Sequence, residues 1–221
     1  MKTLVLFLAA AATVSAQVAE SANKNYQTVE QREGMLRNLA AADRAERLKG
    51  EAIVQSLHVK PGMTVADLGT GGGAMLPLFS AAVGAGGKVI AEDIFPDVLA
   101  RAKKDHSGLT NVTYLLGTER DAKLPAGSTD LAVTVDAYHH YDYPKEMLAS
   151  IKRGLKTGGR LVIVDYYKQP GAMGSGTNAL EHIRIDKADV VKEVEANGFQ
   201  LVESIEHVPG KQYIAIFVLR P

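Results

Sequence analysis

The 221-residue sequence contains no cysteine and no tryptophan. The lack of cysteine excludes disulfides, thiolate metal sites and a cysteine nucleophile. The sequence also lacks an excess of charge of either sign, with 25 basic and 25 acidic residues. Without such an excess, nothing predicts a surface for nucleic acid or for an anionic membrane. The balanced charge therefore indicates that the partner is a small molecule.

Long hydrophobic runs are missing too, apart from a short one near the N-terminus. Lys2 precedes the apolar stretch 4–12, and the small residues 14–16 follow it, which is the pattern of a secretory signal peptide. The stretch is shorter than the roughly 20 residues of a membrane-spanning helix. We therefore expect residues 1–16 to be a signal peptide of an exported protein, periplasmic or secreted, that keeps no membrane span after cleavage. An uncleaved N-terminal anchor is the alternative.

Beyond Pro61, short β-rich runs alternate with helical segments, which predicts a parallel sheet with crossover helices. The expected strands are residues 64–67, 88–91, 112–116, 130–134 and 160–165. The expected crossover helices are residues 74–83, 96–106 and 144–155. The predicted fold class is α/β, a Rossmann-like, doubly wound, seven-stranded sheet that is mostly parallel.

Segments on either side of this pattern complete the predicted architecture. Apolar positions between Glu30 and Leu57 recur at helical spacing, with Gly50 as a break between two helices, so we expect an N-terminal helical cap. Near the C-terminus, a helix at 187–196 precedes two β-rich runs that can pair as an antiparallel hairpin, 200–205 and 212–219. The predicted divisions are the signal peptide, an extension with the cap, and the main domain, at residues 1–16, 17–49 and 50–221.

A glycine-rich turn follows the first predicted strand, at Gly69, Gly71, Gly72 and Gly73. Glycines allow positive φ and close approach of a ligand to the main chain, and the helix start beyond them presents free N–H groups. Asp93 ends the next strand, where a carboxylate can accept hydrogen bonds from ribose hydroxyls. Loop and acid together predict a nucleoside cofactor. The alternative is a tight strand–helix turn with Asp93 as a helix cap.

The loop alone does not decide which nucleoside binds. Residues 69–74 fit both a G-x-G-x-G loop and a looser dinucleotide fingerprint. Three features favour a methyl donor: Asp67 directly upstream as an acceptor for an amino group, the Gly158-Gly159 turn before the fifth strand, and the C-terminal hairpin. An NAD-dependent oxidoreductase is the alternative that these features disfavour.

From about residue 50 to the C-terminus, these motifs resemble class I S-adenosylmethionine-dependent methyltransferases. The resemblance implies that Asp93 binds the cofactor ribose and that Ile94 packs on adenine. It implies that the methionyl part is held at the glycine loop, by Asp67, Gly69, Gly71 and Gly73. Further candidates for cofactor contacts are Thr118, Asp121 and Asp136. The expected cofactor is S-adenosylmethionine.

An aromatic and histidine cluster, residues 136–144, follows the fourth strand. Methyl transfer requires alignment of the nucleophile with the sulfonium, exclusion of water and, for an N–H or O–H acceptor, a group that takes a proton. His139 or His140 is the candidate base or positioning group, and Tyr138 is the candidate pocket wall. Ordinary packing at a strand end is the alternative. Weaker candidates for the same crevice are residues 165–167, 181–184 and a loop at 171–176.

The sequence predicts no metal site. Neighbouring side chains on extended backbone point to opposite faces, so His139 and His140 are not expected to share an ion. No H-x-x-x-H or H-E-x-x-H spacing is present, and a centre of His139, Glu181 and His182 is a minor alternative. The predicted function is S-adenosylmethionine-dependent methyl transfer to a small molecule. The alternative is a noncatalytic nucleoside-binding module on the same fold outside the cytosol.

Overall fold

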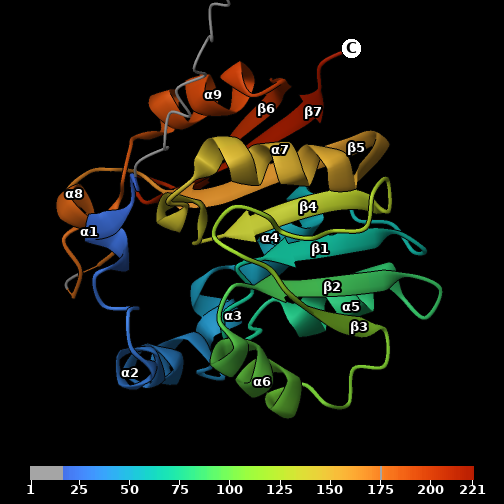
Figure 1. The fold of residues 1–221 in the computed structure, drawn as a ribbon, viewed down its shortest axis with the longest axis horizontal. Helices are drawn as coiled ribbons and strands as arrows, with labels where there is room; N and C mark the ends of the chain where they lie inside the picture. The colour runs from blue at the N-terminus through green and yellow to red at the C-terminus, as the bar shows by residue number, and fades with distance from the viewer. Residues whose placement is uncertain (1–16, 175) are drawn as a thin grey trace, which may run out of the picture.

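The centre of the molecule is a seven-stranded sheet of order β3-β2-β1-β4-β5-β7-β6 (Figure 1). The computed structural model describes residues 17–174 and 176–221, so the predicted signal peptide and Ser175 lie outside the described residues. Strands β1 to β5 are parallel, whereas β7 is antiparallel to both β5 and β6. The predicted fold class is confirmed. The strands are β1 (Thr64–Leu68), β2 (Lys88–Asp93), β3 (Val112–Leu116), β4 (Thr129–Val135), β5 (Leu155–Tyr166), β6 (Phe199–Val208) and β7 (Gln212–Leu219).

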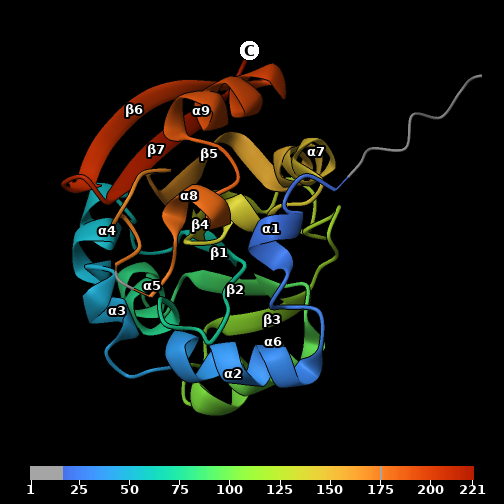
Figure 2. The same ribbon diagram turned by 90° about the vertical axis from the view of Figure 1, so that its left-hand side faces the viewer.

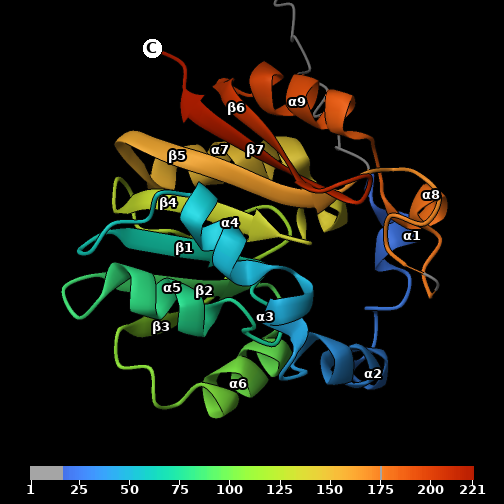
Figure 3. The ribbon, with the colours of Figure 1, turned by 180° about the vertical axis from the view of Figure 1, so that it is seen from behind.

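Helices cover both faces of the sheet (Figures 1 and 3). They are α1 (Glu20–Asn23), α2 (Val29–Leu39), α3 (Arg44–Arg47), α4 (Gly50–Ser56), α5 (Leu76–Val83), α6 (Pro96–Asp105), α7 (Pro144–Gly154), α8 (Ala179–His182) and α9 (Lys187–Ala196), with a short 3-10 helix, η1 (Tyr138–His140). Buried residues of α4 and α5 pack on one face, and those of α7 and α9 pack on the other. No helix among the described residues has the length and apolar character needed to cross a membrane.

The two faces of the sheet bury alternate residues of each strand, as the pleat requires. In β1, Val65 packs with α4 and α5, while the next residue, Ala66, packs with α7 and α9. Phe79 of α5 and Leu148 of α7 are fully buried against the opposite faces. Because both faces are covered there, the central parallel strands β1, β2 and β4 are largely buried and apolar, which made them visible in the sequence.

Most predicted elements differ from the observed ones by one to three residues at a bound, and two differences have a clear physical reason. The break between α3 and α4 lies at Leu48 and Lys49, directly before the predicted Gly50, which is the first residue of α4. A Cβ at Gly50 would lie 2.6 Å from Leu78 Cδ1, so the glycine permits close packing of α4 on α5. Strand β5 begins at Leu155, five residues before the predicted start, because Leu155 already pairs with Thr129 across an irregularity in β4.

The carboxyl ends of the parallel strands meet at one edge of the sheet. The glycine loop follows β1, Asp93 ends β2, Asp136 follows β4 and Asp165 lies near the end of β5. The N-terminal segment with α1 and α2 crosses in front of this edge, beside α8 (Figure 2). This placement brings the sequence-predicted loop, acids and histidines to one end of the sheet, under a helical cover.

Candidate active site

The loop after β1 turns sharply at glycines. Gly69 has φ 69°, and a Cβ there would lie 2.8 Å from Ala137 Cβ, so the turn requires glycine. A Cβ at Gly72 would lie 2.6 Å from the backbone nitrogen of Ala40, just after α2. The glycines therefore make room for the N-terminal cover as well as for a ligand.

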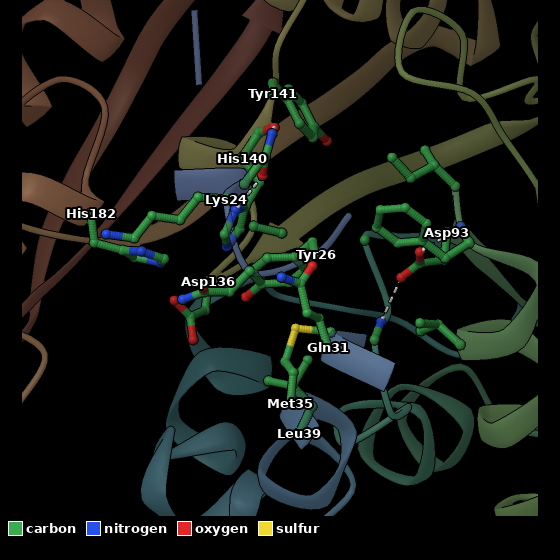
Figure 4. A pocket seen from close by; sticks show the side chains of 18 of the residues that line it. Lys24, Tyr26, Gln31, Met35, Leu39, Asp93, Asp136, His140, Tyr141 and His182 are labelled. Carbon is green, nitrogen blue, oxygen red and sulfur yellow. Dashed lines mark hydrogen bonds between the residues drawn. The ribbon is translucent and has the colours of Figure 1, made fainter. Parts of the chain in front are cut away.

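Asp93 faces this loop. Its Oδ2 accepts a hydrogen bond from the Gly71 N–H at 3.0 Å, and its Oδ1 accepts one from the Phe95 N–H at 3.0 Å (Figure 4). Burial raises the pKa of Asp93 to about 6, although these N–H donors oppose the shift. The predicted ribose-binding acid and the glycine loop are thus held together by a direct contact.

A cavity of about 850 Å³ lies between the sheet edge, the N-terminal segment and the α8 region. Asp93 lies at one end of the view in Figure 4, and Asp136 and His182 lie at the other, with Tyr26 between them. Gly69, Gly71, Ile94, Asp136 and His140, all predicted site residues, line this cavity. Its volume falls within the range of small-ligand pockets.

Sequence reasoning missed a buried acid beside Asp93. Glu92 is only 2% exposed, and its Oε2 accepts a hydrogen bond from the Gly69 N–H at 3.3 Å. Burial, with the charge of Asp93, raises the pKa of Glu92 well above its usual value. Asp67, which bonds to the Thr70 hydroxyl, has its pKa raised to about 7 by burial. A glutamate inside a buried strand was the signal that could have revealed this group.

We expect Glu92→Gln to stabilise the protein at alkaline pH. A raised folded-state pKa means that the contribution of Glu92 to stability is present below its unfolded pKa and is lost as pH rises toward the folded value. The neutral amide avoids that loss. We expect a melting temperature higher by about 2 °C or more at pH 8 and nearly unchanged at pH 5. Circular dichroism melts at both pH values check this, with exposed Glu203→Gln as control. An equal change at both pH values would contradict it.

Asp136 pairs with Arg44 of α3. The two side chains are 11% and 14% exposed, respectively. Burial raises the pKa of Asp136, and the Arg44 guanidinium opposes this shift. The backbone of Asp136 has φ 56°, which is uncommon for a residue with a side chain. This ion pair joins the N-terminal segment to the end of β4 at the cavity wall.

His139 and His140 lie in η1. The prediction that they lie on extended backbone, with their side chains on opposite faces, is therefore wrong. The 3-10 turn places the two rings side by side, with centroids 4.1 Å apart. His139 Nδ1 lies 2.8 Å from Asp165 Oδ1, and the His139 N–H donates to Asp165 Oδ2 at 3.1 Å. Burial lowers the pKa of His139, but the Asp165 carboxylate outweighs it, so the pKa is raised overall. His139 is a buried member of a carboxylate–imidazole pair.

His140 and His182 complete a group of three imidazoles. His140 Nδ1 lies 2.8 Å from Asn23 Oδ1, a residue of α1 that sequence reasoning did not select. The ring centroid of His182 lies 5.0 Å from that of His139 and 5.2 Å from that of His140. Burial lowers the pKa of His140 well below its usual value and that of His182 to about 4. Both rings are therefore neutral at pH 7, and both line the cavity.

Other predicted residues lie elsewhere. Tyr138 is not a pocket wall, because it is fully buried and donates its hydroxyl to Glu193 Oε1 at 2.7 Å. Tyr141, one 3-10 turn later, lines the cavity instead. Besides Tyr138, the predicted residues that do not line this cavity are Asp67, Gly73, Thr118, Asp121 and His139. Thr118 and Asp121 bridge to each other, and Glu119 between them faces the cavity.

Comparison with known proteins agrees with this geometry. A family model described as a methyltransferase domain matches residues 66–163, from β1 into β5. A solved S-adenosylmethionine-dependent methyltransferase from Aquifex aeolicus is 28% identical, covers 84% of this chain and 97% of its own, and gives a TM-score of 0.77. Residues 66–163 of this chain form a methyltransferase domain of the class I S-adenosylmethionine-dependent type. The predicted family, with S-adenosylmethionine as its cofactor, is confirmed.

Curated relatives of this chain match over a shorter region than the solved structure does. The ubiquinone/menaquinone biosynthesis C-methyltransferase UbiE of Shewanella pealeana is 30% identical over 118 residues, 52% of this chain and 47% of the relative. An uncharacterized 37.1 kDa protein in transposon TN4556 of Streptomyces fradiae is 34% identical over 128 residues, 58% of this chain and 37% of the relative. The chain spans about half the length, or less, of these relatives.

The cavity fits the methyltransferase cofactor. Gly69 and Gly71 expose main chain to it, and Asp93 and Ile94 line it at the end of β2. Asp93 and its buried neighbour Glu92 place carboxyl groups beside the loop, which suits a ligand with a sulfonium and an ammonium group. These residues would hold S-adenosylmethionine, which supplies an activated methyl group when bound.

Proposed function

We propose that this protein transfers the methyl group of S-adenosylmethionine to a small-molecule acceptor. The contact between Asp93 and the Gly71 N–H carries this proposal. It lies on the wall of a cavity that His140 and His182 also line. The glycine loop and Asp93 bind the donor, and the other end of the cavity receives the acceptor. Methyl transfer then requires the acceptor atom to lie in line with the sulfonium.

The histidine end of the cavity supports an acceptor site. His140 and His182 line it, and Asn23 and Tyr26 from the N-terminal segment lie beside them. Neutral imidazoles can accept a proton from an acceptor or hold its nucleophilic atom. The N-terminal segment lies over this end, which favours a compact acceptor over a macromolecule.

Mass spectrometry with S-adenosylmethionine carrying a deuterated methyl group tests the proposal. The acceptor panel contains hydroxyl, amine and thiol compounds, together with quinone-ring carbon acids, since a relative is a UbiE C-methyltransferase. We expect a labelled product with the wild-type protein and none with Asp93→Ala. Binding of the donor without labelled product across the panel would instead support a noncatalytic binding module.

A further inference from the structure

Three imidazoles converge where the acceptor end of the cavity meets η1. His139 and His140 come from η1, and His182 is the last residue of α8. One ring nitrogen from each of the three lies within 4.8 Å of the other two. Tetrahedral coordination with metal–nitrogen bonds of about 2.0–2.1 Å separates ligand nitrogens by about 3.4 Å. Small side-chain rotations therefore bring the three nitrogens to the spacing of one metal ion.

Hydrogen bonds fix which nitrogen of His139 is free. Asp165 Oδ1 lies 2.8 Å from His139 Nδ1, and a carboxylate can only accept, so Nδ1 carries the proton. Nε2 is the nitrogen left for a metal, because it is buried, has no hydrogen-bond partner among the described residues and presents a lone pair once the ring is neutral. Because His139 is only 2% exposed, water does not readily reach this nitrogen. A buried acceptor without a partner is costly and indicates a ligand.

The orientation of His140 follows in the same way. Asn23 donates its Nδ2 to Asp142 Oδ2 at 3.0 Å and to the His140 carbonyl at 2.9 Å, which fixes Asn23 Oδ1 as an acceptor. His140 Nδ1, 2.8 Å from that oxygen, must be the donor. Its Nε2 therefore also presents a lone pair. Each of the two rings has an outer partner that orients it, as metal-binding histidines commonly do.

We propose that His139, His140 and His182 bind a divalent transition metal of the zinc type. Imidazole nitrogens suit zinc and its neighbours, metal binding displaces a proton from a charged histidine, and three protein ligands leave a fourth position for another group. His140 and His182 line the cavity, so that position faces the acceptor end. An oxygen or sulfur atom of the acceptor is the expected fourth ligand, and this last role alone rests on the proposed function.

Lys24 lies beside this group, next to His182 (Figure 4). Its positive charge would oppose a bound metal. Lys24 is exposed, and its long side chain can turn into solvent. We therefore expect Lys24→Met to bind the metal at least as tightly as the wild-type protein.

Zinc titration of the chelator-treated, untagged protein against a chromophoric competitor tests the site. We expect one Zn²⁺ per chain with a dissociation constant in the micromolar range or below. His182→Asn removes a partly exposed ligand without disturbing the buried His139–Asp165 pair. We expect the affinity for Zn²⁺ to fall at least about 100-fold. His58→Asn, at an exposed histidine with φ 49°, is the matched control and should bind as the wild type does.

Substitution of Co²⁺ gives a second reading of the same site. We expect the intense visible absorption of tetrahedral nitrogen-ligated cobalt in the wild type and its loss in His182→Asn. Absence of stoichiometric Zn²⁺ binding, or equal affinity in His182→Asn and wild type, would overturn the proposal. Both measurements are made without S-adenosylmethionine, so their failure is distinguishable from failure of methyl transfer.

Discussion

Asp93→Ala is expected to lower the affinity for S-adenosylhomocysteine at least about 100-fold, measured by isothermal titration calorimetry. A carboxylate that accepts two ribose hydroxyls forms two charge-assisted hydrogen bonds, each contributing about 1.5–3 kcal/mol. The substitution also removes the acceptor of the Gly71 N–H, so the glycine loop loses the contact that holds it against β2. Both effects weaken binding of the adenosyl group.

The matched control is Asp105→Ala at the end of α6, whose carboxylate pairs with Arg101 away from the cavity. Its affinity should stay within about twofold of the wild-type value, because surface ion pairs contribute little. Wild-type affinity in a folded Asp93→Ala protein would show that the nucleoside does not use the end of β2. Circular dichroism of both variants establishes that each is folded.

Arg44→Met is expected to destabilise the protein by about 3–5 kcal/mol, the usual cost of leaving one member of a buried ion pair without its partner. For a chain of this size, that loss lowers the melting temperature by about 6–20 °C. The methionine fills similar space but cannot neutralise Asp136. Asp136 must then remain as a buried charge or take up a proton. Thermal melts at pH 7 measure the effect.

Two variants separate this charge effect from general damage to α3. Arg47→Met lies on the same helix, where Arg47 and its partner Asp43 are 47% and 61% exposed, and should change stability by less than about 1 kcal/mol. Adding Asp136→Asn to Arg44→Met should recover a large part of the loss. Equal destabilisation by Arg44→Met and Arg47→Met would contradict the role of the buried pair.

Most of the fold could be predicted from local patterns in the sequence. Helices α6 and α7 begin at Pro96 and Pro144, as predicted, because proline suits a first helical turn where no N–H is needed. The glycine loop and Asp93 belong to one strand–helix–strand unit, and their contact spans only 22 residues. Such features depend on neighbours in the chain, so periodicity and motif spacing reveal them.

Contacts between distant segments were not predictable in this way. Arg44 pairs with Asp136 across 92 residues, and Asn23 orients His140 across 117 residues. In both contacts, the local sequence pattern of one segment does not indicate which distant residue it will contact. The choice of Tyr138 as a pocket wall was wrong for a related reason. The 3-10 turn rotates Tyr138 into the core and brings Tyr141 to the cavity.

The central claim is that the adenosyl group binds between the glycine loop and the end of β2, and a crystal structure with S-adenosylhomocysteine tests it most directly. We expect the ribose hydroxyls on Asp93, the methionyl part along Gly69 and Gly71, and the sulfur facing the histidine end of the cavity. A ligand bound elsewhere, or a folded protein that takes up none at saturating concentration, would contradict the account.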